Sequence, residues 1–402
     1  MKFAMSQSVT RQDALRLMKE NWKAIPAGEV VPLADAVGRV TAEDIFSRHT
    51  LPVFRASCFD GIAVNSACFC DGMPDTSAWT EGRDFVRADT GDDFPDAFDT
   101  VIAVEDVEFT DEGGVQFREG FVYDGEVTVD PAGTIVSRGS LLVSAHTRVT
   151  PEVAVVLAIG GVVWVPVLRK LRVAFIPTGD ELVAAGVVPQ RGQNVEANSL
   201  MVAALLRQWG AEVLCHPVVP DSAAVLEEAL DAALVSCDMV LINGGSSRGE
   251  ADLNSRILER RSTFFRHGVR TVPGRPVGMA IVAGKPVVNL PGPVAAAYLA
   301  SHWLVCGLVH SYYGIPVPVL PRVRARLVSE MRKRPGFELV ARVALQKEGE
   351  GYSAVPVNWD VDLVDMLRRT DGFVTVPAES GALPAGCEVE VELLKGIEWI
   401  GR

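Results

Sequence analysis

The sequence has few of the residues that would indicate a disulfide-stabilised or nucleic-acid-binding protein. Its seven cysteines are odd in number and scattered through 402 residues, which is typical of reduced thiols rather than of a disulfide framework. The formal net charge is −13, so Lys and Arg are in deficit and binding to a nucleic-acid backbone is disfavoured. A small anionic ligand stays compatible with this balance, because backbone N–H groups, a few basic side chains or a metal ion can hold one.

Long apolar runs and the commonest phosphate-binding motifs are also missing. Residues 152–168 are apolar but interrupted by Gly-Gly and Pro, and the run 294–309 is shorter than the roughly 20 residues that a membrane span needs. Residues 1–22 contain no apolar core of signal-peptide length. There is no G-x-x-x-x-G-K-[ST] motif and no G-x-G-x-x-G after a strand. We therefore expect a soluble cytoplasmic protein that binds neither membrane nor nucleic acid.

The first part of the chain changes character twice. Residues 8–24 carry apolar side chains at helical spacing and predict a capped amphipathic helix. Gly, Asp and Pro then punctuate many short alternating runs, a pattern typical of β structure. We expect an inserted β domain at 51–147 that interrupts a discontinuous N-terminal helical domain formed by 1–50 and 148–170.

The second part alternates strands with helices and then returns to short strands. Residues 172–177 and 238–243 are typical of buried strands, and amphipathic helices are expected between and after them. Strands joined by helices are parallel, so residues 171–316 predict a doubly wound α/β domain. After a proline-rich linker, residues 317–402 predict a small C-terminal β barrel, partly open at one edge.

Two loops that follow predicted strands of the α/β domain combine glycine, hydroxyl and carboxylate side chains. They are residues 178–182, TGDEL, and residues 244–252, GGSSRGEAD. Ligands of doubly wound sheets bind outside the carboxyl ends of the strands. Glycines let backbone N–H groups approach a phosphate, and carboxylates beside a phosphate require a divalent cation between them, which favours Mg²⁺. The alternative is that Gly and Ser simply turn the chain and cap the next helix.

Six groups of motifs occur in one order along nearly the whole chain. The first is PLADAVGRVTAEDI with LPVFRASCFDGIAV, followed by ADTGDDFPDAFDTVIAVED, PTGDEL with GQNVEANS, NGGSSRGEAD, VPGRP and NLPGP. In this order the chain resembles the molybdopterin molybdenumtransferases, the MoeA family, and the equivalent domain of gephyrin. The resemblance implies a MogA-like α/β domain, an inserted β domain, a helical N-terminal segment and a C-terminal β barrel.

The resemblance also implies a reaction. Family enzymes take adenylylated molybdopterin and molybdate, place the metal on the dithiolene sulfurs and release AMP, with Mg²⁺ required. The altered oxyanion residues described below leave tungstate open as the substrate in place of molybdate. The resemblance further implies a homodimer, with each active site between the α/β domain of one subunit and the inserted β domain of the other.

Functional residues can be carried over only where the motifs match. Asp60, Glu181 and Asp252 match positions implied in catalysis and Mg²⁺ binding. The positions implied in binding the pterin, the nucleotide or the oxyanion are Thr90, Thr178, Asn198, Ser199, Asp221, Gly244, Gly245, Ser246, Ser247, Arg275 and Arg342. Each has a structural alternative: Asp60 and Thr90 could form turns, Asp221 could cap a helix, and Asn198 with Ser199 could begin one.

The departures from the family pattern gather on the oxyanion side. Val272 and Arg275 stand where the family has lysines, and Met366 stands near the place of a serine. Arg266, His267 or Arg270 could restore the positive charge, depending on which way their strand faces. These changes keep a second hypothesis open, that of a non-catalytic molybdopterin-binding carrier or regulatory paralogue. A third is a nucleotide-hydrolysing enzyme unconnected to molybdenum.

Overall fold

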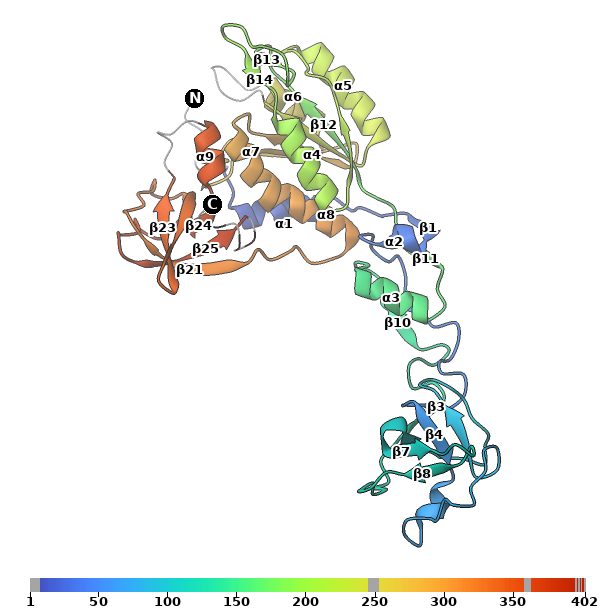
Figure 1. Ribbon diagram of the computed structural model, residues 1–402. Coiled ribbons are helices and arrows are strands. Elements are labelled where there is room, and N and C mark those ends of the chain that lie inside the picture. The colour runs from blue at the N-terminus through green and yellow to red at the C-terminus, as the bar shows by residue number, and fades with distance from the viewer. Residues whose placement is uncertain are drawn as a thin grey trace. The chain divides into compact units, whose positions relative to one another are not determined.

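The computed structural model describes residues 8–244, 253–357, 363–394, 396, 398 and 400, and it divides into two compact units (Figure 1). One unit joins the residues up to Ala27 to those from Arg169 onward, and the other is Gly28–Leu168. Residues 1–27 are therefore separated from 28–50, which the sequence had led us to place in one domain.

The N-terminal helix explains this difference. Helix α1 (Arg11–Asn21) begins after Thr10, whose hydroxyl accepts a hydrogen bond from the Asp13 N–H at 3.0 Å. Its buried residues, Ala14 and Met18, face the unit that contains the α/β sheet, and Trp22 stacks on Tyr312 with ring centroids 6.3 Å apart. The apolar face of this helix is thus buried against the α/β unit.

A six-stranded sheet forms the centre of that unit, in the order β15-β12-β16-β20-β19-β17. The first four strands are parallel, β19 is antiparallel to β20, and β17 is antiparallel to β19, so β17 runs in the direction of the first four. The strands are β12 (Arg172–Pro177), β15 (Glu212–Cys215), β16 (Met239–Asn243), β17 (Phe264–His267), β19 (Gly278–Val282) and β20 (Lys285–Leu290). A short parallel pair, β13 (Leu182–Val183) and β14 (Asn194–Val195), lies in the connection that follows β12.

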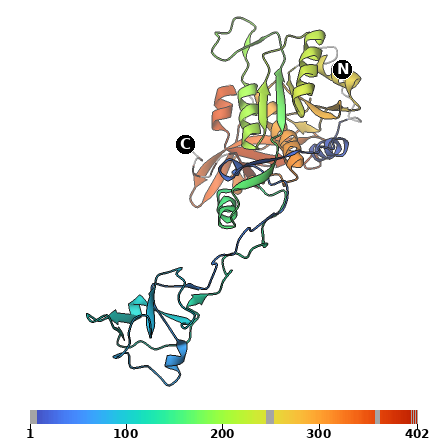
Figure 2. The same cartoon turned by 90° about the vertical axis from the view of Figure 1, so that its right-hand side faces the viewer.

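Helices cover both faces of this sheet (Figure 2). Even-numbered residues of β12, such as Ala174 and Ile176, pack with Leu230 of α5 and Leu258 of α6. Helices α4 and α7 contact strands of the same sheet without belonging to that cluster. The helices are α4 (Asn198–Gln208), α5 (Ala223–Ser236), α6 (Leu253–Arg261) and α7 (Val294–Ala300). The predicted doubly wound α/β architecture is confirmed.

The strand order places a topological switch point between β12 and β16. After β12 the chain forms β15, which lies on one side of β12 in the sheet. It then forms β16 on the other side of β12, and β20 lies next to β16 in the sheet. Ligands of doubly wound sheets bind where the order reverses, at the carboxyl ends of the two central strands. The two loops singled out in the sequence begin at these two strand ends.

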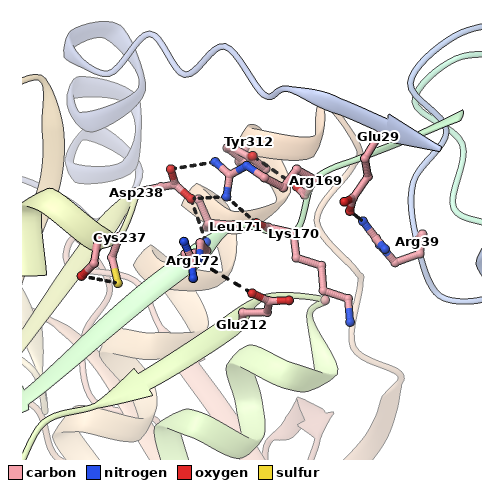
Figure 3. Close-up of polar contacts among 12 residues, drawn as sticks. Glu29, Arg39, Arg169, Lys170, Leu171, Arg172, Glu212, Cys237, Asp238 and Tyr312 are labelled. Carbon is pink, nitrogen blue, oxygen red and sulfur yellow. Dashed lines mark hydrogen bonds and ion pairs between the residues drawn. The ribbon is translucent and has the colours of Figure 1, made fainter. Parts of the chain in front are cut away.

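The opposite, amino edge of the sheet is tied by an ion pair (Figure 3). Arg169 donates from both terminal guanidinium nitrogens to the Asp238 carboxylate, at 3.1 and 2.9 Å, and the Arg172 N–H donates to the same carboxylate at 2.8 Å. Burial opposes the charge on Asp238, but these hydrogen bonds outweigh it and lower the pKa of the carboxyl. The starts of β12 and β16 are thereby fixed to each other.

The last helix of the α/β domain extends beyond the apolar run 294–309. Helix α7, a π-helical turn (Ser301–Val305) and α8 (Cys306–Tyr313) form a continuous 20-residue helix, Val294–Tyr313. Within the described ranges it is the one helix whose length and composition would suit a membrane span, but 72% of its most apolar stretch is buried inside the protein. It is therefore typical of a core helix of the α/β unit.

The C-terminal β structure is a closed barrel rather than a partly open one. Strand β22 (Glu338–Glu348) pairs with β24 through Leu339–Val343 and with β23 through Val343–Glu348, so this long strand closes the ring. The other strands are β21 (Arg322–Leu327), β23 (Gly351–Pro356), β24 (Gly372–Val376) and β25 (Glu388–Leu393). Strand β18 (Thr271–Val272) adds to β22 from outside, and helix α9 (Leu363–Arg369) lies between β23 and β24 in the chain.

The Gly28–Leu168 unit contains two groups of short elements. The first has the core residues Ala36, Val149, Leu157 and Val165, and its elements are β1 (Gly28–Pro32), α2 (Leu33–Ala36), β2 (Ile45–Phe46), β10 (Leu141–Val143), α3 (Pro151–Ile159) and β11 (Trp164–Leu168). The second contains β3 (Ala56–Ser57), β4 (Gly61–Val64), β5 (Phe85–Ala88), β6 (Thr100–Ala103), β7 (Val107–Phe109), β8 (Val115–Phe117) and β9 (Val129–Asp130). These short strands agree with the β structure predicted for 51–147.

Candidate functional site

Four buried asparagines lie beneath the carboxyl edge of the α/β sheet. Asn198 belongs to α4, Asn243 to β16, Asn254 to α6 and Asn289 to β20, and none is more than 6% exposed. The Asn198 amide donates to the Asn243 side-chain oxygen at 2.8 Å, and the Asn254 amide donates to the Asn289 side-chain oxygen at 3.2 Å. These side chains link two helices to two strands, and so they fix the framework from which the loops emerge.

Thr178 and Gly244 form part of the same framework. The Thr178 hydroxyl donates to the Asn243 carbonyl and accepts from the Asn254 amide, both at 3.3 Å. Gly244 has φ 126°, and a Cβ on it would lie 2.3 Å from the Thr178 carbonyl oxygen. Thr178 and Gly244 therefore contact other parts of the protein, and the ligand contacts expected of them stay a prediction.

We expect Gly244→Ala to lower the free energy of unfolding by about 3 kcal/mol, because the methyl group meets backbone at a positive φ. Gly292→Ala is the matched control, since a Cβ there would lie 3.9 Å from its nearest neighbour, the Gly244 Cα. Urea unfolding of both variants measures the difference. Equal stability of the two variants would contradict the close approach of Gly244 to Thr178.

Three acidic side chains come together where the loops after β12 and β15 meet. The Asp221 N–H donates to Asp180 Oδ1 at 3.1 Å, and the Gly179 N–H donates to the Val219 carbonyl at 3.0 Å. Burial, followed by the charges of Asp180 and Glu181, raises the pKa of the Asp221 carboxyl. Asp221 thus lies near two other acidic side chains, and the cluster carries negative charge at the carboxyl edge of the sheet.

Asp221 does not cap helix α5, which was the alternative interpretation. Ser222 occupies the N-cap position, and no side-chain hydrogen bond caps that helix start. At the start of α4, the Ser199 N–H donates to Glu196 Oε1 at 2.9 Å and its hydroxyl donates to the other Glu196 oxygen, so the Glu196 carboxylate satisfies an N–H of the first turn.

The acidic cluster does not form a complete protein cage for a metal. Across residues 8–244, 253–357 and 363–394, no three His, Cys, Asp or Glu side chains are grouped as metal ligands. Asp252, the predicted partner of Glu181, lies outside the described residues, as do Gly245, Ser246 and Ser247. Mg²⁺ commonly takes one or two carboxylates and completes its shell with water and substrate phosphates, so a partial set suits a phosphate-bridging ion.

A cavity of about 280 Å³ lies in the C-terminal part of the same unit. Its charged lining residues are Glu330, Arg332 and Arg342, and the remaining lining is apolar and comes from Pro273, Met331, 339–341, Pro356 and Val357. Arg342 is 6% exposed, and burial lowers its pKa, although a guanidinium keeps its charge at neutral pH. A buried cation in a half-apolar cavity is a chemically suitable site for a small oxyanion.

The three residues that depart from the family pattern, Val272, Arg275 and Met366, lie close in the chain to lining residues of this cavity but do not line it themselves. Val272, on β18, pairs in parallel register with Leu339. The Arg275 guanidinium lies over the Phe337 ring, 5.6 Å from its centroid. Met366 is buried with Ala295 and Val357 in an apolar cluster. An apolar side chain therefore occupies the place where the family comparison led us to expect a serine.

Asp60 and Thr90 meet in the other unit. The Thr90 N–H and hydroxyl both donate to Asp60 Oδ1, at 2.6 and 2.7 Å, and these bonds lower the pKa of Asp60. A Cβ on Gly61 would lie 1.9 Å from the Ile102 carbonyl oxygen, so glycine is required after this aspartate. The structure thus brings together two of the predicted residues and presents an ionised carboxylate on the surface.

The fold and these sites define a class: a multidomain protein with a doubly wound α/β domain that carries acidic loops at its switch point, an inserted β domain and a C-terminal β barrel. Three known domains match the chain in this order. Residues 9–161 match the MoeA N-terminal region (domain I and II), 174–311 a probable molybdopterin binding domain, and 324–394 the MoeA C-terminal region (domain IV). The chain belongs to the MoeA family of molybdopterin molybdenumtransferases.

Individual relatives agree with this assignment over nearly their full length. The molybdopterin molybdenumtransferase of Haemophilus influenzae is 28% identical over 394 residues, which cover 90% of this chain and 93% of that protein. The enzyme of the same name from Bacillus subtilis is 26% identical, with 92% and 91% covered. A crystal structure of a molybdopterin biosynthesis MoeA protein from Pyrococcus horikoshii superposes with a TM-score of 0.79 at 28% identity, covering 97% of this chain and all of that one.

Proposed function

We propose that the protein inserts molybdate, or tungstate, into adenylylated molybdopterin and releases AMP in a Mg²⁺-dependent reaction. The observation that carries the proposal is the presence, in one compact unit, of an acidic cluster at the switch point and a buried arginine in a small cavity. The first suits the phosphate end of a nucleotide with its cation, and the second suits a tetrahedral oxyanion. Soluble, cytoplasmic cofactor synthesis is part of this proposal.

Each group has a role in this proposal. Glu181 and Asp221, with Asp252 and Asp60 by resemblance, would hold Mg²⁺, which when bound neutralises phosphate charge and makes AMP a better leaving group. Arg342 would hold the oxyanion by charge-assisted hydrogen bonds and so fix its position toward the sulfurs. The asparagine framework would hold the loops in place without contacting the reacting atoms.

A homodimer completes the proposal. Asp60 and Thr90 belong to the Gly28–Leu168 unit, whereas Glu181, Asp221 and Arg342 belong to the other. The resemblance to the family implies that these two sets come from different subunits of one active site. Such sharing would explain why the exposed, ionised Asp60 is bonded to Thr90 and belongs to a different unit from Glu181 and Asp221.

The test is a single assay on the purified full-length protein. With Mg²⁺, adenylylated molybdopterin and molybdate or tungstate, we expect AMP release that depends on the oxyanion and stops when EDTA removes the metal. Binding of the pterin with no AMP release would support the carrier that Val272 and Met366 suggest. AMP release without any oxyanion would instead indicate a nucleotide hydrolase, and light scattering at twice the 43.2 kDa chain mass checks the dimer.

A further inference from the structure

The first strand of the Gly28–Leu168 unit has one side that no other described strand covers. β1 pairs with β11 in one continuous antiparallel register. On its opposite side β11 is bonded to residues 40–42, because the Ala42 N–H donates to the Pro166 carbonyl at 3.0 Å and the Leu168 N–H donates to the Val40 carbonyl at 2.8 Å. Among the described residues β1 has no second partner strand, so it is the edge of this small sheet.

The hydrogen-bond pattern shows which backbone groups of β1 point away from β11. In an antiparallel pair, successive residues direct their N–H and C=O groups alternately to the two sides of the strand. Pro166 and Leu168 face residues 40–42, so Val165 and Val167 face β1. Their register partners on β1, residues 31 and 29, therefore face inward, and residues 28, 30 and 32 face outward.

The outward groups are backbone donors and acceptors that no described residue satisfies. Val30 and Gly28 each present an N–H and a carbonyl, and Pro32 presents a carbonyl only. No hydrogen bond to these groups occurs in the described part of the chain. A row of such groups is a template for pairing with a further strand.

The exposed face of the same ribbon is apolar. Val30 and Trp164 are 63% and 54% exposed, and Pro32 lies opposite Trp164 in the register. These side chains project away from the core, which takes the alternate residues Val31, Val165 and Val167. A further strand along β1 would cover part of this apolar surface as well as the backbone groups.

The edge of β1 lacks the charge and the bulge that commonly keep edge strands from pairing with other chains. Its one charged residue, Glu29, is neutralised by an ion pair with Arg39 (Figure 3), and its register with β11 has no bulge. In contrast, the net negative charge of the chain, −13, is contained entirely in residues 51–147, so two inserted β domains repel each other. The neutral edge of β1 is therefore the better surface for a contact between two identical chains.

We propose that two copies of this chain pair through β1, antiparallel across a two-fold axis at Val30. The contact rests on the homodimer of the proposed function and gives that dimer a defined surface. Each Val30 donates to and accepts from the partner subunit's Val30, and each Gly28 N–H donates to the carbonyl of the partner subunit's Pro32. Proline has no N–H, and this register requires only its carbonyl. A two-fold contact of this kind uses the same patch on both copies and closes as a dimer.

The first test places a thiol on the proposed axis of the full-length protein. The Cα atoms of a hydrogen-bonded antiparallel pair lie about 5.5 Å apart, within the range that a disulfide spans. Val30→Cys oxidised with copper phenanthroline should therefore form a covalent dimer, with the two introduced thiols joined in the peptide map. Val235→Cys, a matched substitution at a site of α5 that is 86% exposed, and the parent with its own cysteines should form no such dimer.

The second test removes the outward donor at the same position. Val30→Pro deletes that N–H without touching the ladder to β11, and an edge strand tolerates proline where its N–H faces solvent. The dimer dissociation constant from sedimentation velocity should rise about tenfold or more, because the symmetry removes two hydrogen bonds at once. Val30→Thr keeps the N–H and should stay within about threefold of the parent.

The outcomes separate this contact from the rest of the proposed function. A parent protein that sediments as a monomer overturns both the contact and the homodimer. A dimer that neither crosslinks in Val30→Cys nor weakens in Val30→Pro overturns the contact alone, and crosslinking decides by itself if Val30→Pro does not fold. AMP release is measured independently, so a dimer that crosslinks through Val30→Cys without releasing AMP would support the contact and remove the transferase reaction.

Discussion

We expect Arg342→Gln to lower oxyanion-dependent AMP release by a factor of about 10² to 10³, the range seen when one preorganised hydrogen-bond donor to a developing charge is removed. Arg342 is 6% exposed in its cavity, so a contact between its guanidinium and an anion would be screened little by solvent. Glutamine keeps a donor and much of the volume but loses the charge. Steady-state kinetics with molybdate and then with tungstate measure the loss.

Two comparisons separate a functional loss from a folding defect. Arg342→Lys keeps the charge without the planar fork and should recover part of the rate at a raised KM for molybdate. Arg324→Gln, on the outside of the same barrel beside Glu388, should leave activity unchanged. A full rate for Arg342→Gln, with thermal unfolding equal to that of the parent, would place the oxyanion elsewhere.

Glu181→Gln and Asp221→Asn should each reduce the rate about 10²-fold at low Mg²⁺, and excess Mg²⁺ should restore part of it, because an amide oxygen is a weaker ligand than a carboxylate. The Mg²⁺ concentration for half-maximal rate is the direct readout. Glu212→Gln, an exposed acid paired with Arg172 at the amino end of the sheet, is the control and should change nothing. A lower maximal rate with an unchanged Mg²⁺ requirement would be evidence against a ligand role.

The pH dependence of this site follows from the raised pKa of Asp221. Without metal, the folded protein holds the Asp221 proton more tightly than the unfolded chain, so this group contributes stability at low pH that is lost as pH rises through its folded pKa. The proposed Mg²⁺ ion would bind the deprotonated carboxylate, so we expect activation by Mg²⁺ to fall as pH is lowered through the same range. Thermal unfolding measured in EDTA and in Mg²⁺ at two pH values checks the direction of both pH dependences, and Asp221→Asn should reduce both.

Much of the α/β unit could be predicted from the sequence, because the spacing of apolar residues and the order of strands and helices determine its architecture. Alternating apolar strands such as 172–177 and 238–243, separated by amphipathic helices, left few topologies open, and the loops after those strands lie at the switch point. The placement of α1 could not be predicted, because the apolar stripe of this helix does not indicate which unit it packs against. In the structure, the stacking of Trp22 on Tyr312 shows that it packs against the α/β unit. The closure of the barrel depends on the length of β22, which pairs with different strands along its two halves.

Among the predicted site residues, Thr90 bonds Asp60 and the charge of Glu181 acts on Asp221, while the roles of these residues stay predictions. Ser199, inside the first turn of α4, donates from its N–H and hydroxyl to Glu196, which belongs to the same motif but was not singled out. Glu330 and Arg332 line the cavity because the fold brings the loop between β21 and β22 to it, and no spacing in the sequence encodes that contact. Asn243 and Asn289 were a missed signal: amides at the ends of the apolar strands β16 and β20 need buried partners.

The asparagine framework also bears on how the protein ages. Asn243 and Gly244 form an Asn-Gly pair, the sequence in which the glycine nitrogen most readily attacks the asparagine side chain and expels ammonia. In the folded chain that nitrogen donates its hydrogen to the Leu290 carbonyl at 3.2 Å, and the Asn243 amide donates to the Pro291 carbonyl at 2.7 Å. Both reacting groups are thus engaged in hydrogen bonds at a buried position. Deamidation at this peptide, followed by mass spectrometry, would therefore record how often the carboxyl edge of the sheet opens during storage.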